Sequence, residues 1–313
     1  MGETPQTTPS SFNDLDNLLT PSLFTLLATS RFPYPKQSPI NFSNFGRDIF
    51  LADPFSPLVK DAAWPALLTL SKYPLDKLPD LHERYLSHPG DPSYPEQCLG
   101  LLLLLDNLPR LLFKGIDARW TFDFFDHLAQ RVVHSWIGLP EEQRPDSWER
   151  WSGKLGARMD YWTGVRFWFG VVLVHSERQG DQELGVVYTE ETRRVVEKAG
   201  GVLDPWRERR EMVLSDVTMF PREYRLGPPQ GEVVTKEKWV FWSGMLMDCH
   251  KPIIDRFGRY PWLNAITGRV STKEEEEYIE RIGHFAEAGE AVRARVKDDV
   301  DAQRWTPLGE DSF

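Results

Sequence analysis

The chain has 313 residues, of which 41% are hydrophobic and 27% are charged, so it can bury a large core in one or two domains. Its net charge of −10 and the lack of a lysine and arginine cluster disfavour nucleic-acid binding. The longest apolar run, residues 99–105, is too short to cross a bilayer, which needs about 20 residues.

The first 22 residues are rich in proline, serine and threonine, and we expect a disordered tail there, followed by a single helical domain over residues 23–313. Prolines recur over residues 31–57, which predicts extended loop. The spacing of apolar residues predicts helices over 58–72 and 76–88, and a long apolar helix over 97–113 with a break or kink at Pro109.

Further helices are predicted over residues 120–137, 161–178, 189–200, 238–258 and 271–296. Thr189 is a candidate N-cap, Gly200 and Gly201 are stop signals, and Thr272 with Glu275 forms a capping-box pattern. Residues 138–160 and 201–237 are polar or rich in proline and glycine, and we expect insertions there. Strand-type alternation is scarce, so the expected fold is all-α, with stacked antiparallel helix pairs and long proline-rich loops.

Five of the twelve tryptophans fall within 33 residues: Trp136, Trp148, Trp151, Trp162 and Trp168. A large helical core accounts for each of them. The cluster also fits a pocket for an apolar ligand, and Trp168 is a candidate lining residue.

The stretch LLLLLDNLPRLLF places Asp106 and Arg110 four residues apart on one helix face, with Asn107 beside them. A structural ion pair is one interpretation. The other is that the pair directs the arginine toward a carboxylate or carbonyl group of a ligand.

The stretch VHSERQGDQ ends a strongly apolar segment. On a continuous helix, His175, Gln179 and Gln182 would share a face, and a Ser-His-acid triad is not indicated. His175 with Glu177 or Asp181 can form an acid/base pair, although a buried structural histidine fits equally well.

Residues 250–272 predict a helix that ends at Gly258, followed by a loop that carries Arg259, Asn264 and Arg269. Such side chains bind anions or carbonyl groups near a helix N-terminus, or only neighbouring loop carbonyls.

No histidine, cysteine or carboxylate pattern has the spacing of a metal site, and neither a phosphate-binding loop nor a dinucleotide fingerprint is present. We therefore expect no metal and no cofactor. The two cysteines, Cys98 and Cys249, suggest no disulfide framework, and the N-terminus does not read as a secretory signal, so a cytoplasmic setting is expected.

In order and spacing, LLLLDNLPRLLFKG, HSERQGDQE and HKPIIDRFGRYPWLNAITGRVST resemble the three motif blocks of a bacterial and fungal family called domain of unknown function 924. The resemblance covers roughly residues 45–285, and its motifs are specific in combination. It implies a helical, tetratricopeptide-like fold and names no activity.

The positions that match the family's usual residues are Asp106, Pro109 and Arg110; His175, Ser176, Glu177, Asp181 and Gln182; and His250, Phe257, Gly258, Arg259, Pro261, Asn264, Gly268 and Arg269.

Two departures bear on function. Asn107 stands where the family commonly has glutamine, and Trp262 with Leu263 replaces a common His-Arg pair. An activity that used that His-Arg pair is therefore in doubt, and the exchange would suit an apolar ligand. The segments 138–160 and 201–237 also exceed the usual family length, and we expect them to cover a pocket.

The first functional hypothesis is a cofactor-independent isomerase, cyclase or lyase of specialised metabolism that acts on an apolar small molecule. Its expected catalytic residues are His175, Arg110 and Glu177, and its expected substrate-binding residues are Asp106, Asn107, Gln182, Arg259, Trp262, Asn264 and Trp168.

Two alternatives stay open. A tetratricopeptide-like interaction module would present an open groove to a peptide. A hydrolase would use acid/base carboxylates, for which no paired spacing stands out.

Overall fold

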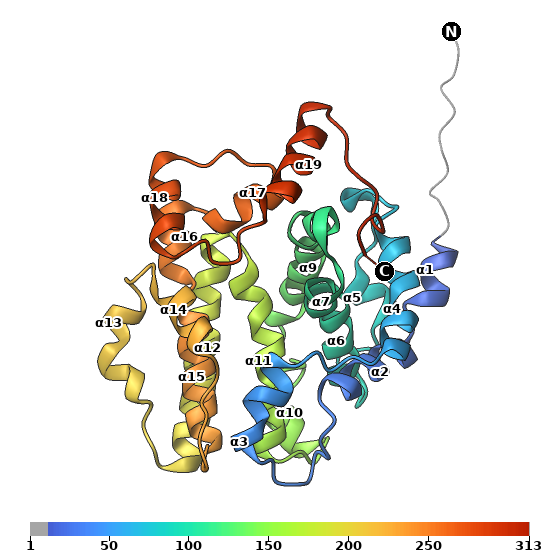
Figure 1. Cartoon of the computed structure of the whole chain (residues 1–313). Coiled ribbons are helices and arrows are strands. Elements are labelled where there is room, and N and C mark those ends of the chain that lie inside the picture. Colours follow the sequence, from blue (N-terminus) through green and yellow to red (C-terminus); the bar gives the residue numbers. More distant parts are fainter. Residues whose placement is uncertain (1–11, 313) are drawn as a thin grey trace.

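The structure is a computed structural model that describes residues 12–312. These residues form helices and connecting loops with no β-strand, which confirms the predicted all-α fold (Figure 1). The tetratricopeptide-like arrangement stays a prediction. None of the helices in this described part is both long and apolar enough to cross a membrane.

The N-terminal part packs two helices where a tail was expected. Its elements are α1 (Asn13–Leu18), α2 (Pro21–Arg31), α3 (Phe42–Phe45), the π-helical turn η1 (Gly46–Leu51), α4 (Pro57–Leu70), the 3-10 turn η2 (Leu75–Lys77) and α5 (Leu81–Tyr85). The tail prediction is wrong for residues 13–22, because Leu15 and Leu19 are buried and Thr20 caps α2 by accepting a hydrogen bond from the backbone N–H of Leu23 at 3.3 Å. Residues 1–11 lie outside the described part of the chain.

The next part contains two π-helical turns. Its elements are α6 (Tyr94–Leu102), η3 (Leu103–Asn107), α7 (Leu108–Leu112), η4 (Gly115–Asp117), α8 (Ala118–Trp120), η5 (Thr121–Phe125) and α9 (Asp126–Ile137). The helix distortion precedes Pro109: the backbone N–H of Leu108 donates to the carbonyl of Leu103, five residues back. The helix then continues through the proline to Leu112.

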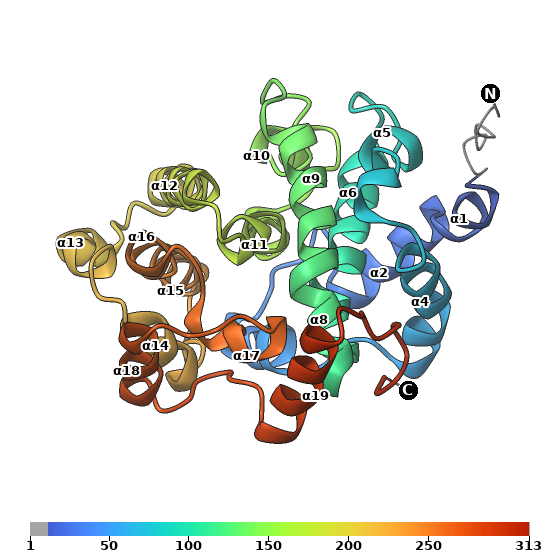
Figure 2. The ribbon, with the colours of Figure 1, turned by 90° about the horizontal axis from the view of Figure 1, so that it is seen from above.

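Helix α11 (Met159–His175) lies in the middle of the molecule and packs against α6, α9, the short α10 (Trp148–Gly153), α12 (Gln179–Gly200) and α15 (Lys236–Asp248) (Figure 2). Its side chains are buried all round, as expected for a helix inside a large core. The helix ends at His175, so the predicted helix over 161–178 was too long.

Helix α12 begins at Gln179, so the prediction that it starts at Thr189 was wrong. The Thr189 hydroxyl instead lies inside the helix and donates to the Asp248 carboxylate at 2.6 Å. The predicted stop is confirmed, because Gly201 ends the helix in the left-handed conformation with φ 66°.

The C-terminal part contains the remaining elements: η6 (Pro205–Arg209), α13 (Arg210–Val213), α14 (Met219–Leu226), α16 (Lys251–Phe257), η7 (Pro261–Leu263), α17 (Asn264–Thr267), α18 (Lys273–Arg281) and α19 (Glu290–Asp301). The predicted capping box of Thr272 and Glu275 is confirmed. The predicted helix over 271–296 is two helices, since the chain takes positive φ values at Gly283, His284 and Ala286. The predicted helix over 238–258 is likewise divided, at Cys249 and His250.

The tryptophan cluster belongs to the core. Trp136, Trp151 and Trp162 are almost completely inaccessible to solvent. The indole N–H of Trp151 donates to the carbonyl of Pro145 at 2.7 Å, and that of Trp162 donates to the carbonyl of Asp146 at 2.8 Å. The Trp162 bond therefore connects the segment 138–160 to α11, whereas the Trp151 bond lies within that segment.

Asp117 anchors the C-terminal end of the described chain. Its buried carboxylate accepts hydrogen bonds from the backbone N–H groups of residues 309–312, at 2.7 to 3.3 Å. A carboxylate that accepts several such bonds is well solvated without water. This contact holds the last described residues against η4, directly before α8.

A close approach of α6 and α2 gives the first prediction. A Cβ atom at Gly100 in α6 would lie 2.0 Å from the carbonyl oxygen of Phe24 in α2. Backbone atoms cannot yield locally, so Gly100→Ala is expected to lower the free energy of unfolding by about 3 kcal/mol, measured by urea denaturation. The matched control is Gly180→Ala, because Gly180 is exposed and a Cβ atom added to it would meet no other atom within 4 Å. Equal stability of the two variants would contradict the prediction.

Candidate functional site

A cavity of about 310 Å³ lies where η5, the end of α11, α14, η7 and the segment after α18 converge. Its walls are mainly aromatic and its polar groups are few, as in many small-molecule sites. The lining residues are Arg110, Phe113, Ala118, Thr121, Phe122, Asp126, His175, Phe220, Tyr224, His250, Tyr260, Trp262, Leu263, Phe285 and Ala286.

One wall of the cavity is a stack of three rings. Tyr260 and Trp262 have ring centroids 4.9 Å apart and an interplanar angle of 26°, and Trp262 and Phe220 are 5.9 Å apart at 28°. Phe285 meets Trp262 edge-on, with centroids 5.5 Å apart at 89°. These contacts stabilise the wall beyond the area that the rings bury.

A buried ion cluster forms the polar side of the cavity. The Arg110 guanidinium donates two hydrogen bonds to the Asp126 carboxylate, at 2.7 and 2.8 Å, and a further one to Asp106 Oδ1 at 3.1 Å. Burial raises the pKa of Asp106, but the opposing effects of Arg110 and His175 are larger and lower it overall. Burial and the nearby Asp106 charge raise the pKa of Asp126 against the effect of Arg110.

His175 is the last residue of α11 and is oriented by Asp106. Its Nδ1 lies 2.6 Å from Asp106 Oδ1, and its side chain is 23% exposed. An ionised carboxylate only accepts hydrogen bonds, so Nδ1 carries a proton. When the ring is neutral, its Nε2 therefore has a free lone pair, and no residue among 12–312 hydrogen-bonds to it.

His250 is a second neutral imidazole on the same cavity. Its Nδ1 donates to the backbone carbonyl of Leu246 at 2.9 Å and lies 3.1 Å from that of Met247. Burial lowers the pKa of His250 to about 3, and the nearby His175 lowers it further in the same direction. Its Nε2 is thus also an acceptor, and it has no hydrogen-bond partner in the described part of the chain.

A second, polar cavity of about 160 Å³ adjoins the first and shares His175, Asp126, Phe122 and Leu263 with it. Its other lining residues are Asp123, His127, Gln130, Ser176, Glu177, Arg178, Thr267 and Arg269. Burial raises the pKa of Asp123 to about 6, against the effect of Arg119. His175 therefore lies between an aromatic cavity and a charged one.

A family model matches residues 78–283 of the chain, more than half of its length, and is described as "Bacterial protein of unknown function (DUF924)". The chain belongs to this family. Searches of curated proteins and of solved structures give no match.

The match to DUF924 includes most of the cavity and ends just before Phe285 and Ala286. The structure brings members of all three motif blocks to one place: Arg110 from the first, His175 from the second, and His250 with Tyr260 and Trp262 from the third.

Glu177, an expected catalytic residue of this DUF924 protein, is occupied by structural contacts. Its carboxylate pairs with Arg269 at 2.5 and 3.0 Å and accepts a hydrogen bond from the backbone N–H of Tyr260 at 2.8 Å. The acid/base pair that the sequence suggested between His175 and Glu177 or Asp181 is not formed, because Asp106 is the residue that binds Nδ1. Asp181 instead accepts a hydrogen bond from Ser176 at 2.6 Å.

Several expected binding residues lie outside both cavity linings. Gln182 donates to the carbonyls of Val174 and Ser176, and Arg259 pairs with the carboxylate of Glu275.

Asn264 is buried and donates to Ser271 at 3.1 Å, and Trp168 stacks under the guanidinium of Arg31 at 3.9 Å. Asn107 is likewise absent from both linings, with its Oδ1 buried and lacking a partner among the described residues.

The structure also adds residues that the sequence analysis did not select. Asp126 lies on the helix after the first motif, and Phe220 and Tyr224 come from the segment 201–237, whereas 138–160 contributes nothing to either cavity. His250 was visible as a motif residue, but no pattern assigned it a role. Among residues 12–312, no group of three or more metal-binding side chains is arranged to hold an ion.

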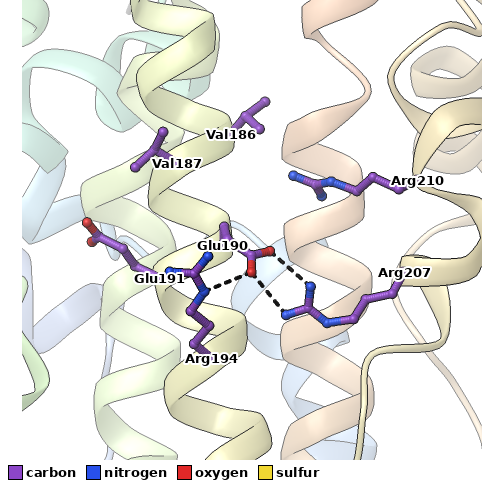
Figure 3. Close-up of a pocket in the computed structure, with 7 residues that line it drawn as sticks. All are labelled: Val186, Val187, Glu190, Glu191, Arg194, Arg207 and Arg210. Atoms are coloured by element: carbon purple, nitrogen blue, oxygen red, sulfur yellow. Dashed lines mark hydrogen bonds and ion pairs between the residues drawn. The ribbon is translucent and has the colours of Figure 1, made fainter.

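A separate groove of about 510 Å³ lies between α12 and the segment 205–213. Figure 3 shows Glu190 between the guanidinium groups of Arg194 and Arg207, with Arg210 on the side of α13. Arg210 pairs with the buried carboxylate of Asp248. The charges of this groove are mutually neutralised, so it is a weaker candidate for a site.

The buried imidazole of His250 gives a prediction about acid stability. Its pKa is about 3 in the folded protein, below the ordinary 6.5, so between these values the unfolded chain binds a proton that the folded chain does not. Above pH 6.5 neither state binds this proton, so it does not affect the free energy of unfolding. Below pH 6.5 the free energy of unfolding falls by up to about 1.4 kcal/mol per pH unit as the pH decreases toward 3.

In His250→Gln, the free energy of unfolding is expected to depend less steeply on pH between pH 6 and 4, measured by denaturant titrations. His88→Gln, at an exposed histidine, is the matched control and is expected to retain the parent's dependence. An unchanged slope in His250→Gln would contradict the burial of a neutral imidazole.

Proposed function

We propose that this protein is a cofactor-independent enzyme that transfers a proton within a small, mainly apolar molecule. Of the isomerase, cyclase and lyase classes, an isomerase is the best fit. The observation that carries the proposal is the Asp106–His175 pair, in which a buried carboxylate orients an imidazole at an aromatic cavity. The free thiols of Cys98 and Cys249 are both buried, which agrees with a reaction in the cytoplasm.

His175 has the properties of a general base. Its Nδ1 proton is directed to Asp106, so Nε2 is available to take a proton from a bound molecule. The imidazolium that results is stabilised by the Asp106 carboxylate at 2.6 Å and returns the proton to another atom of the same molecule. While the proton is on His175, whose side chain is 23% exposed, it can exchange with solvent.

Arg110 donates mainly to the two carboxylates, which leaves few of its N–H groups for a substrate. Both of its terminal nitrogens donate to Asp106 or Asp126, so most of its N–H groups are directed to carboxylates. Its role in the proposal is to keep Asp106 ionised in a buried place, because its charge opposes the desolvation of that carboxylate.

Deuterium uptake from solvent tests the proposal without a known substrate. The folded protein is incubated in D2O with a library of small apolar carbonyl compounds and amines, and mass spectrometry reports which compound gains deuterium. We expect uptake with the parent, a loss of at least about 100-fold in His175→Ala, and partial rescue of that variant by added imidazole.

Asp106→Asn is expected to lower the rate as well, since the wrong tautomer is then favoured, and His88→Gln serves as the control. Undiminished uptake in folded His175→Ala would remove His175 from the mechanism and with it the proposal.

A further inference from the structure

The polar atoms that the two cavity histidines offer to a ligand are hydrogen-bond acceptors. Nδ1 of His175 is directed to Asp106 and Nδ1 of His250 to a backbone carbonyl, so the neutral rings present only their Nε2 lone pairs. No described residue donates a hydrogen bond to either Nε2. A ligand that donates hydrogen bonds would satisfy both atoms.

The Arg110 guanidinium, which lines the cavity, is largely engaged by carboxylates. It directs its Nη atoms to Asp106 and Asp126, and further donors of the cavity are neutral groups such as the Thr121 hydroxyl and the Trp262 indole. An anionic ligand would therefore lose its hydration and would have to share Arg110 with two carboxylates.

The fixed charges beside the cavity carry one unbalanced negative charge when His175 is neutral. Asp106 and Asp126 are two carboxylates that share the single guanidinium of Arg110, so one negative charge is unbalanced when His175 is neutral. Burial raises the pKa of Asp126, and the nearby charge of Asp106 raises it further. A ligand cation beside this cluster would balance it.

An aromatic wall of the cavity is suited to the same charge. Phe220, Trp262 and Phe285 surround one side of the cavity, with Tyr224 in contact with Phe285 at a centroid distance of 5.5 Å. Aromatic rings attract a desolvated cation. The contribution of Trp262 is limited, because its faces are stacked on Tyr260 and Phe220.

We propose that the natural ligand of this cavity is a primary ammonium ion with an apolar body. The ammonium group donates to the two imidazole Nε2 atoms and faces the aspartate cluster, and the apolar body packs against the aromatic stack. The inference rests on the proposed function in taking this cavity as the substrate site, but it concerns binding alone.

Three probes with the same phenyl-ethyl body separate the charge states: 2-phenylethylammonium, 2-phenylethanol and 3-phenylpropionate. Isothermal titration calorimetry on the full chain is expected to show that the ammonium ion binds at least about ten times more tightly than the carboxylate, with the alcohol between them. A carboxylate that binds as tightly as the ammonium ion, or a lack of binding by all three, would overturn the inference.

Variants test which groups recognise the charge. Asp126→Asn is expected to weaken ammonium binding about tenfold and to leave alcohol binding unchanged, whereas Asp61→Asn, which removes an exposed carboxylate, changes neither. If Asp126→Asn does not fold, Phe285→Leu replaces it. This variant is expected to weaken the binding of the ammonium ion several-fold more than the binding of the alcohol. Equal losses for the two ligands in the folded variant would refute the assignment.

Calorimetry measures no turnover, so the two proposals fail separately. Ammonium binding together with undiminished deuterium uptake in His175→Ala would remove the proposed function and leave the ligand class standing. Loss of deuterium uptake in that variant, together with no preference for the ammonium ion in calorimetry, would leave the proposed function standing and refute the ligand class.

Discussion

The buried charge of Asp106 is the constraint on which the centre of the molecule depends. A carboxylate inside a run of leucines is too costly to bury alone, and it must be paired and hydrogen-bonded. Arg110 and His175 supply those partners, and Arg110 also binds Asp126. One small cluster therefore joins α6–α7, α9 and α11, and removal of any member would leave another charge unpaired. The geometry that makes the helices pack correctly is also the geometry that orients His175.

Two π-helical turns set the positions of these groups. The turn η3 contains Asp106 and ends two residues before Pro109, and η5 contains Phe122 and Asp123. Each turn inserts a residue into the ordinary helical repeat and rotates all that follows, and such turns are frequent at functional sites. Without η5, the side chain of Asp126 would point in a different direction around the helix axis relative to Trp120 and Phe122. The distortion is thus a means of directing polar side chains from apolar helices toward one cavity.

The sequence was sufficient to predict contacts between residues three or four positions apart. It was insufficient to predict contacts between distant segments or the direction of side chains after a helix distortion. The all-α fold, the Asp106–Arg110 pair and the capping box at Thr272 follow from spacings of three or four residues, which any helix preserves. Asp126 was missed because sixteen residues and a π turn separate it from Arg110. Glu177 was assigned to His175 because it is near in sequence, but α11 ends between them, and the chain turns the carboxylate toward Arg269. The tryptophan cluster misled for a related reason: large rings fill cores as readily as they line pockets, and composition does not distinguish the two.

Part of the wall of the aromatic cavity lies just beyond the end of the family match. The family match ends at residue 283, and the next residues contribute Phe285 and Ala286 to the lining. His284 and Ala286 have φ values of 51° and 55°, a conformation that side chains with a Cβ rarely adopt and that costs on the order of 1–3 kcal/mol. Packing of Phe285 against Trp262 and Phe220 offsets that strain. The polar cluster of Asp106, Arg110, Asp126 and His175 therefore lies within the family match, and the ring of Phe285 lies in a strained segment beyond it. Substitutions in this segment or at Trp262 and Leu263 would therefore change the shape of the cavity without changing the groups that carry charge.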